Sequence, residues 1–233
     1  MSYNPYMGRL ESYLQSCGIG QYDKYERFLD RLFEWNQKFN LTAIADRADA
    51  EDKHIIDSLL GAEYVRGDTV LDIGAGAGFP SVPLAIAMPD KKFTLADSLG
   101  KRVKFLEFII DDLPLENVRA IHARAEDLPK TALYDTVTAR AVAPLNVLVE
   151  YCLPFVKPGG VMLAYKAAGV TEELAAAGRG IGILGGGEPV VYSKTLCTTR
   201  EETVGRTFVV IEKVRPTPKA YPRGGNKPRL KPL

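Results

Sequence analysis

Three acidic residues each follow an apolar segment that is typical of a buried strand. These residues are Asp72, Asp97 and Glu126. An ionised carboxylate can attract an ammonium group of a ligand and can accept hydrogen bonds from its hydroxyl groups. Carboxylates repeated at the ends of successive strands therefore predict a site for a polar small molecule.

A glycine-rich turn follows Asp72 in the segment VLDIGAGAGFP, residues 70–80. Its glycines are Gly74, Gly76 and Gly78. Glycine allows the backbone to turn tightly and to approach a ligand closely. A dinucleotide-binding turn would read G-x-G-x-x-G, whereas the spacing here is G-x-G-x-G, and Phe79-Pro80 fills the position that such a turn keeps small. A carboxylate would also repel a pyrophosphate but attract the α-ammonium of S-adenosylmethionine, which we therefore expect as the cofactor; a plain tight turn is the alternative.

The other two acids have defined roles in this interpretation. Asp97 ends the segment KKFTLAD and is expected to accept hydrogen bonds from both ribose hydroxyls. The alternative is a solvated aspartate that caps the following helix. Ala125 and Glu126 come just after the third predicted strand, where an adenine edge would lie. Taken alone, Glu126 would more often be a surface residue.

The elements that must position these residues follow an α/β pattern from residue 69 onward. We predict seven strands, the first five alternating with helices and the last two forming a near-hairpin, in residues 69–74, 91–97, 117–123, 133–140, 160–166, 189–194 and 207–214. This order predicts a doubly wound, mostly parallel sheet with an antiparallel edge strand. The preceding part is predicted to be helical over residues 7–38 and 54–65, with a loop over 39–52. The glycine-rich segment at 178–187 is interpreted as a flexible connector.

The composition excludes several classes of protein. The chain of 233 residues has 46% hydrophobic and 25% charged residues, which is typical of one large soluble domain. No apolar run reaches the ~18 residues of a membrane span, and the N-terminal residues lack the features of a signal peptide. The three cysteines are far apart and only two histidines are present, so we expect no metal site and a cytoplasmic location.

The basic residues are distributed unevenly. Residues 213–233 contain seven Lys or Arg and no Asp or Glu, and because prolines punctuate this segment we expect an extended tail. Such a tail could follow the phosphates of an anionic polymer, although most basic termini are only solvated. Lys101 and Arg102, at the start of a predicted helix beside the cofactor crevice, could extend that path.

Several segments of the chain resemble one known family. They are WNQKFNLTAI, HIIDSLL, VLDIGAGAGFPSVPLAI, LADSLGKRVKFL, ARAED, TARAVAPL and TPKAYPRGGNKPRLKPL. In this order they are similar to the bacterial methyltransferases that modify guanine N7 in small-subunit (16S) ribosomal RNA, historically called glucose-inhibited division protein B. The resemblance implies a class I, Rossmann-like methyltransferase fold with a helical N-terminal extension. It divides the chain into a helical cap (1–65), a methyltransferase domain (66–214) and the basic tail (215–233).

The resemblance also implies which residues form the site. By this match, Gly74, Phe79, Ala125, Glu126 and Arg140 stand where the family contacts its cofactor. The residue pattern described above adds Asp72, Gly76, Gly78 and Asp97 to the expected cofactor contacts. Thr42 matches a segment that borders the pocket. Together with the basic residues above, the candidate RNA contacts are Asn40, Lys101, Arg102, Lys166, Lys219, Arg223, Lys227, Arg229 and Lys231. Ala167 follows Lys166 where the family commonly has glycine, so the role of that loop is less defined.

The chemistry implied by the family needs no general base. Guanine N7 has an in-plane lone pair, so the enzyme has only to align the methyl group with N7, which can contribute roughly 7–11 kcal/mol. Arg140 is expected to hold the cofactor carboxylate or the guanine O6, and a salt bridge at a strand end is its alternative. His54 and Asp57 would share a helix face and anchor the helix by a hydrogen bond.

Other functions remain as alternatives at this point. A nicotinamide dehydrogenase is opposed by Asp72 and by Phe79-Pro80. A small-molecule methyltransferase or a non-catalytic RNA-binding scaffold would keep the same fold. Ribosomal RNA or the small ribosomal subunit is the expected partner, with a monomer favoured.

Overall fold

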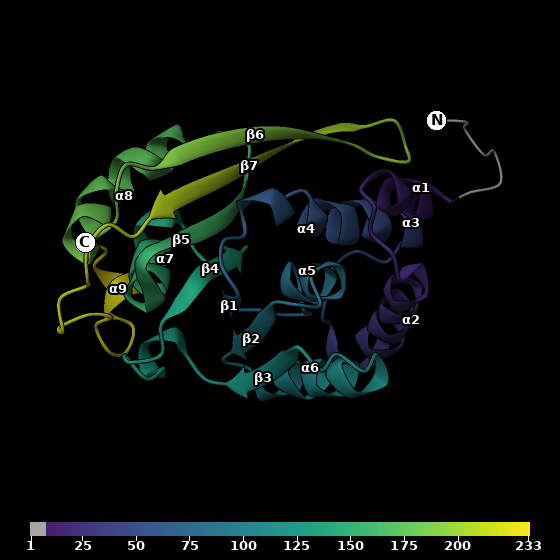
Figure 1. Ribbon diagram of the computed structural model, residues 1–233, viewed down its shortest axis with the longest axis horizontal. Helices are drawn as coiled ribbons and strands as arrows, with labels where there is room; N and C mark the ends of the chain where they lie inside the picture. The colour runs from purple at the N-terminus through teal and green to yellow at the C-terminus, as the bar shows by residue number, and fades with distance from the viewer. Residues whose placement is uncertain (1–7) are drawn as a thin grey trace.

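The computed structural model describes residues 8–233, which form a seven-stranded sheet with helices on both faces (Figure 1). The strand order is β3-β2-β1-β4-β5-β7-β6. The strands are β1 (Thr69–Ile73), β2 (Lys92–Asp97), β3 (Val118–His122), β4 (Tyr134–Arg140), β5 (Val156–Ala167), β6 (Val190–Cys197) and β7 (Thr203–Glu212). Strands β1 to β5 pair in parallel, whereas β7 is antiparallel to both β5 and β6. The predicted α/β class and mostly parallel sheet are confirmed.

The strand order places the glycine turn at the centre of the sheet. Strand β1 pairs with β2 on one side and with β4 on the other, so the chain reverses its direction of winding there. Residues 70–73 are all buried because helices cover both faces of this strand. The carboxyl ends of β1, β2 and β4 therefore meet around the turn that follows Ile73, where open α/β sheets bind ligands.

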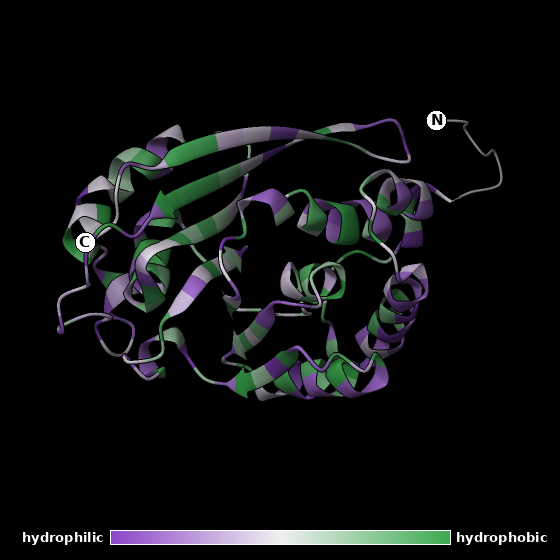
Figure 2. Cartoon of the chain, in the orientation of Figure 1, coloured by the Kyte–Doolittle hydropathy of each residue, from purple (hydrophilic) through white to green (hydrophobic). Residues whose placement is uncertain are grey.

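Helices cover the two faces of the sheet in separate groups. On one face of the sheet, a hydrophobic core joins residues of the N-terminal helices with α5, α6 and the strands β1 to β3. On the other face, a second core joins α7 and α8 with the sheet. The α-helices are α1 (Arg9–Ser16), α2 (Tyr22–Phe39), α3 (Arg47–Ala50), α4 (Asp57–Leu59), α5 (Ser81–Ala87), α6 (Gly100–Asp112), α7 (Leu145–Cys152), α8 (Thr171–Leu184) and α9 (Lys227–Leu230). Hydrophilic and hydrophobic bands alternate along α2 and α6 in Figure 2, as expected for helices with one buried face.

The N-terminal region differs from the sequence prediction in its details. The helix predicted over 7–38 is two helices, because the chain turns at Gly18, which has a φ of +68°. The loop predicted over 39–52 is partly helical, since α3 begins at Arg47 and continues into a π-helix, η1 (Glu51–Ile56). The helix predicted over 54–65 is correspondingly divided among η1, α4 and a 3₁₀ turn, η2 (Ala62–Tyr64).

Two other expectations were wrong. The segment predicted as a flexible connector is mostly the regular helix α8, which ends at Gly185 in the left-handed conformation that favours glycine. The expected extended tail instead folds back against α7 and α8 and contains the short helix α9. Repeated glycines and prolines lower the intrinsic propensity for ordered structure, but tertiary packing compensates for it here.

No helix within residues 8–233 meets the length and hydropathy needed to cross a bilayer.

Candidate functional site

The glycine turn after β1 shows which of its glycines leaves room for a ligand. All three glycines have positive φ, with values of +73° at Gly74, +60° at Gly76 and +93° at Gly78. A Cβ on Gly74 would lie 2.6 Å from Val142, and one on Gly78 would lie 2.6 Å from Val82, so the protein's own packing excludes side chains there. A Cβ on Gly76 would meet nothing closer than 3.8 Å. Space for a ligand is therefore open beside Gly76.

Asp72 is buried at the end of β1 without a hydrogen-bond partner. The residue is 1% exposed, and neither carboxylate oxygen has a partner among the described residues. Burial raises the pKa of Asp72 to about 7, although Ser81 and Arg140 act in the opposite direction. A buried acid with no partner is costly unless a ligand supplies one. The site therefore fits a ligand with an ammonium group.

Asp97 is buried at the end of β2 and connects two turns. Its Oδ2 accepts a hydrogen bond from Gly76 N at 2.9 Å, and its Oδ1 accepts one from Leu99 N at 2.8 Å. Arg102 also contacts Oδ2, at 3.4 Å. At 2% exposure this carboxylate is not the solvated helix cap of the alternative interpretation. Oδ1 keeps an acceptor position for a ligand hydroxyl.

Ala125 and Glu126 lie in a 3₁₀ turn, η3 (Ala125–Asp127), directly after β3. Ala125 is buried, and the Glu126 side chain is only 6% exposed. Its nearest cation is Arg124, at 4.0 Å. The turn thus presents a small apolar surface beside a largely covered carboxylate at the third strand end.

Arg140, at the end of β4, is held by the N-terminal region. Its guanidinium donates to Asp57 Oδ2 at 2.8 Å and lies 3.3 Å from His54 Nδ1. The guanidinium carbon is also 5.2 Å from the ring centre of Phe79. Asp57 accepts a second ion pair from Arg206 of β7. The salt bridge that was the alternative role for Arg140 is therefore present, and it joins β4, β7 and α4.

His54 completes this arrangement as a neutral ring. Burial, followed by the charge of Arg140, lowers its pKa to about 3. Since Arg140 donates to Nδ1, the proton is assigned to Nε2, which donates to Thr42 Oγ1 at 2.7 Å. The ring stacks on Phe79 with centroids 4.3 Å apart. The predicted anchoring role of His54 and Asp57 is confirmed, but their partners lie on other elements.

Two further parts of the site were missed by the sequence analysis. Asn36 Oδ1 accepts from Thr42 N and its Nδ2 donates to Thr42 O, which fixes the loop after α2. Arg206 and Lys53 line a cavity of about 470 Å³ with Arg140 and His54. Neither cation lies in a recognisable motif, because the strands and helices that bring them together are distant in sequence.

Lys166 borders the same cavity but is committed to the protein. Its Nζ donates to Glu173 Oε2 at 2.6 Å and to the carbonyl of Ala143 at 3.0 Å. The same Glu173 oxygen accepts from Leu145 N at 2.7 Å, at the start of α7. Lys166 therefore orders the loop after β4. This structural role is better supported than a direct contact of Lys166 with RNA.

The remaining candidate RNA contacts divide into exposed residues and one anchored residue. Lys101 donates to the carbonyl of Phe39 at 3.0 Å, and Asn40 is exposed at the end of α2. The guanidinium of Arg223 pairs with the buried Glu150 at 2.6 Å, so a structural role stands beside the predicted RNA contact of this residue. The candidate RNA contacts in the tail that are exposed are Lys219, Lys227, Arg229 and Lys231.

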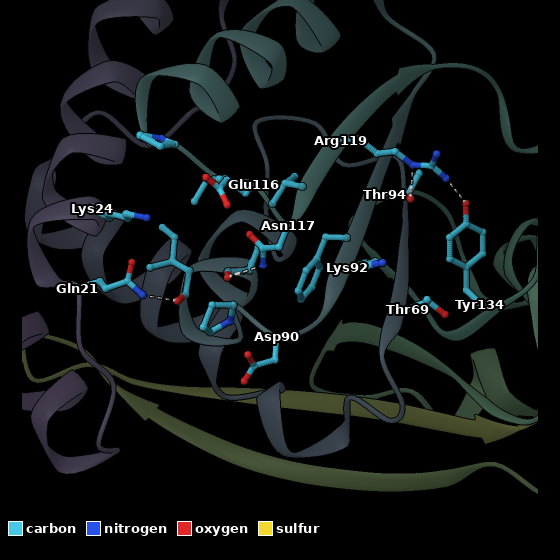
Figure 3. Close-up of a pocket in the computed structure, with 17 residues that line it drawn as sticks. Gln21, Lys24, Thr69, Asp90, Lys92, Thr94, Glu116, Asn117, Arg119 and Tyr134 are labelled. Atoms are coloured by element: carbon cyan, nitrogen blue, oxygen red, sulfur yellow. Dashed lines mark hydrogen bonds between the residues drawn. The ribbon is translucent and has the colours of Figure 1, made fainter.

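A larger cavity lies at the opposite end of the strands (Figure 3). Its volume is about 700 Å³, and Figure 3 shows Lys92, Thr94, Arg119 and Asn117 among its lining residues. These residues lie at the amino ends of β2 and β3, whereas the glycine turn lies at the carboxyl end of β1. The cavity and the glycine turn are therefore at opposite ends of the strands. It contains none of the predicted site residues. We therefore assign the functional site to the carboxyl ends of the strands.

The comparisons with known proteins agree on one family. The family model described as rRNA small subunit methyltransferase G matches residues 21–196. The chain belongs to the rRNA small subunit methyltransferase G family. It is 46% identical over 220 residues to the ribosomal RNA small subunit methyltransferase G of Brevibacillus brevis, covering 91% of both chains. The protein of the same name from an Exiguobacterium species is 44% identical, again with 91% of both chains covered.

Solved structures support the fold of this family member. A putative O-methyltransferase from Klebsiella pneumoniae matches with a TM-score of 0.55 and 14% identity, covering 86% of this chain and 94% of that one. The match shows the fold alone, and it confirms the predicted class I methyltransferase architecture. The family predicted from the sequence segments is likewise confirmed. Within residues 8–233 no group of three or more His, Cys, Asp or Glu side chains could hold a metal ion.

Proposed function

We propose that this member of the methyltransferase G family transfers a methyl group from S-adenosylmethionine to N7 of a guanine in small-subunit (16S) ribosomal RNA. The observation that carries the proposal is the buried, unpartnered carboxylate of Asp72 beside the open space at Gly76. The family membership and the names of the relatives support RNA as the substrate.

The residues at the strand ends fit this cofactor. Asp72 would pair with the α-ammonium group, and such a partner would remove the cost of burying the carboxylate. Asp97 would accept hydrogen bonds from the ribose hydroxyls. Ala125 and Glu126 would border the adenine, and the bare backbone of Gly76 would allow the cofactor to approach. When bound, S-adenosylmethionine supplies an electrophilic methyl group on its sulfonium centre.

The protein's own contribution is positioning. Guanine N7 attacks through its lone pair and loses no proton, so no side chain has to act as a general base. His54 agrees with this, since its ring is neutral and both nitrogens are already hydrogen-bonded. Arg140 and Phe79 are held rigidly between β4 and α4, so they can define one wall of the site. Rigid walls reduce the entropy that alignment costs.

The cavity beside Arg140 supports an anionic substrate. Its lining contains Arg140 and Arg206, which share the one carboxylate of Asp57. Lys53 also lines it but pairs with Asp49 and Glu202. A phosphate near the target base would meet this positive charge. We further propose that the protein works as a cytoplasmic monomer without a metal ion.

A labelling assay tests the reaction. Small-subunit particles lacking their N7 modification are incubated with the protein and methyl-labelled S-adenosylmethionine, and the RNA is then cleaved with aniline at N7-methylguanine. We expect label at one cleavable guanine. If S-adenosylhomocysteine binds but no RNA is labelled, the substrate assignment is wrong, and a small-molecule methyltransferase or a non-catalytic scaffold replaces it. If S-adenosylhomocysteine does not bind and no RNA is labelled, the roles proposed for Asp72 and Gly76 are wrong.

A further inference from the structure

The last part of the chain separates its basic residues into two groups. Residues 213–233 contain seven Lys or Arg and no acidic residue. They also lie outside residues 21–196, which the family model matches. Lys213 and Arg223 are turned inward, whereas the other five are exposed. The exposed group consists of Arg215, Lys219, Lys227, Arg229 and Lys231.

Arg223 is held by a carboxylate in the interior. Glu150, on α7, is 0% exposed. Its Oε1 accepts from Arg223 N and Nε, both at 2.8 Å, and its Oε2 accepts from Nη2 at 2.6 Å. Arg223 also donates to the carbonyl of Lys231 at 2.9 Å, which closes the last turn of the chain onto the same anchor. A paired, charge-assisted contact of this kind is geometrically specific.

Further contacts hold both ends of the segment. Lys213 Nζ donates to the carbonyls of Leu153 and Leu184 and to Thr217. Lys130 donates to the carbonyl of Lys219 at 3.0 Å. Apolar residues add to this packing, namely Tyr221, Pro222, Pro228 and Leu233. The backbone of residues 215–233 is therefore fixed on α7 and α8.

The five exposed cations have no acidic partner. Within residues 8–233, no carboxylate of the protein lies within 4.0 Å of any of them. Like charges that are held close together repel one another, and only an anion from outside relieves that repulsion. A solvated, mobile terminus would spread such charges, whereas here the backbone that carries them is anchored at Lys219, Arg223 and Lys231.

The surface reaches the cofactor side of the molecule. Helix α9 packs against α7, and α7 also contacts η3, which carries Ala125 and Glu126. The side chain of Arg124, directly before η3, is 57% exposed. Helix α7 thus contacts both the basic helix α9 and the turn beside the proposed adenine site.

We propose that residues 215–233 form a preorganised phosphate-binding surface for the RNA backbone, and that Glu150 is its positioning residue. This inference rests on the proposed function, which supplies the RNA. Because the backbone of the segment is already ordered, RNA binding does not have to order it again. The five cations contribute charge, and the pair of Glu150 with Arg223 determines where that charge lies.

Neutralising the exposed charges is the first test. A variant with Arg215, Lys219, Lys227, Arg229 and Lys231 all changed to Gln is compared with the wild type for binding to a transcribed small-subunit RNA over a range of salt. We expect weaker binding and a salt slope smaller in magnitude by up to about 3.5, at 0.7 per phosphate contact. S-adenosylhomocysteine affinity should not change. An unchanged slope in the variant would overturn the inference.

Glu150→Gln tests the positioning role. The five cations remain, so we expect the salt slope to persist while the KM for RNA rises several-fold and kcat at saturating RNA stays the same. Arg223→Lys keeps one charged contact with Glu150 and should give an intermediate KM for RNA. This variant replaces Glu150→Gln in the test if Glu150→Gln does not fold. The control is Glu212→Gln, which removes the exposed pair with Arg66, both 53% exposed.

The outcomes separate this inference from the proposed function. If wild-type protein labels RNA and all variants match it in KM and slope, the surface is not used and the reaction stands. If wild-type protein neither binds nor labels RNA, the proposed function has failed and the inference fails with it.

Discussion

At the scale of single residues, the buried Asp72 and the half-buried His54 both favour their neutral forms. Burial raises the pKa of Asp72 from 3.8 to about 7 and lowers that of His54 from 6.5 to about 3. Between pH 4 and 7 the folded state binds more protons than the unfolded state at Asp72, so this group makes the free energy of unfolding fall as the pH rises. At His54 the unfolded state binds more protons between pH 3 and 6.5, so its contribution rises with pH. The two effects oppose each other over the same range.

Asp72→Asn should reveal this opposition. The substitution keeps the side-chain volume but removes the titrating acid. The decrease that Asp72 causes in the free energy of unfolding, on the order of 4 kcal/mol between pH 4 and 7, is therefore absent in the variant. We expect the free energy of unfolding of the variant to rise more steeply from pH 4.5 to 7 than that of the wild type. Urea unfolding at several pH values measures this.

The same substitution should weaken cofactor binding. If Asp72 pairs with an ammonium group, wild-type affinity for S-adenosylhomocysteine should fall as the pH drops below 7, and that of the variant should be low throughout. Asp90→Asn, at an exposed position far from the site, is the matched control. Parallel pH profiles in all three proteins would contradict the role assigned to Asp72.

Sequence alone placed the three acids of the candidate site at the strand ends, but it did not reveal the contacts around them. Asp72, Asp97 and Glu126 were found because a strand followed by a turn is a local pattern. The contacts of Arg140 with His54 and Asp57 connect residues more than 80 positions apart, so no local pattern encodes them. The contact of Arg223 with Glu150 was missed for the same reason, since the two residues are 73 positions apart.

At the scale of elements, the glycine turn separates folding from binding. Gly74 is required because its missing Cβ makes room for Val142, which lies in the loop before α7. Gly76 has no such neighbour, so its lack of a side chain serves no packing purpose in the protein itself. One turn therefore contains a glycine needed by the fold and a glycine available to a ligand.

Gly76→Ala should mainly weaken cofactor binding, whereas Gly74→Ala should mainly lower the stability of the fold. At a φ of +60° the alanine at position 76 costs roughly 1 kcal/mol of stability, and its methyl group occupies the open space. We expect at least a tenfold loss of S-adenosylhomocysteine affinity, or about 1.4 kcal/mol. Gly74→Ala should lower the melting temperature more, because its Cβ would lie 2.6 Å from Val142. Titration calorimetry and thermal unfolding of both variants test this, and unchanged affinity at position 76 would contradict the ligand position.

The elements themselves were predictable to different degrees. The seven strands were found because apolar runs and turn residues alternate regularly, which is a strong local signal. Helix α8 was missed because Gly178, Gly180 and Gly182 oppose helix formation by about 1 kcal/mol each. A Cβ on Gly180 would lie 3.3 Å from both Val149 and Leu233, so close tertiary packing favours the glycine that helix propensity disfavours.

At the scale of the whole molecule, the long β6–β7 hairpin reaches the N-terminal helices (Figure 1). Thr199 N, near its tip, donates to Asp52 Oδ2 at 2.5 Å. Arg9 of α1 donates to the other oxygen of Asp52, also at 2.5 Å. Arg200 adds an ion pair with Asp46 at 3.3 Å. The first and last thirds of the chain thus meet at one buried carboxylate. Leu10 and Leu196 belong to the same hydrophobic core as residues of α5 and α6.

Asp52→Asn should therefore destabilise the protein as one unit. Asp52 is 0% exposed, and removing its charge weakens the hydrogen bonds that it accepts from Arg9 and from Thr199 N, at a cost on the order of 2 kcal/mol. Because the N-terminal helices share a core with β2 and α6, we expect a single transition at a lower temperature, with equal calorimetric and van 't Hoff enthalpies. Two separate transitions would mean that the helical region folds independently of the sheet. Glu63→Gln, which removes the surface pair with Lys194, should leave the transition nearly unchanged, because exposed ion pairs contribute little.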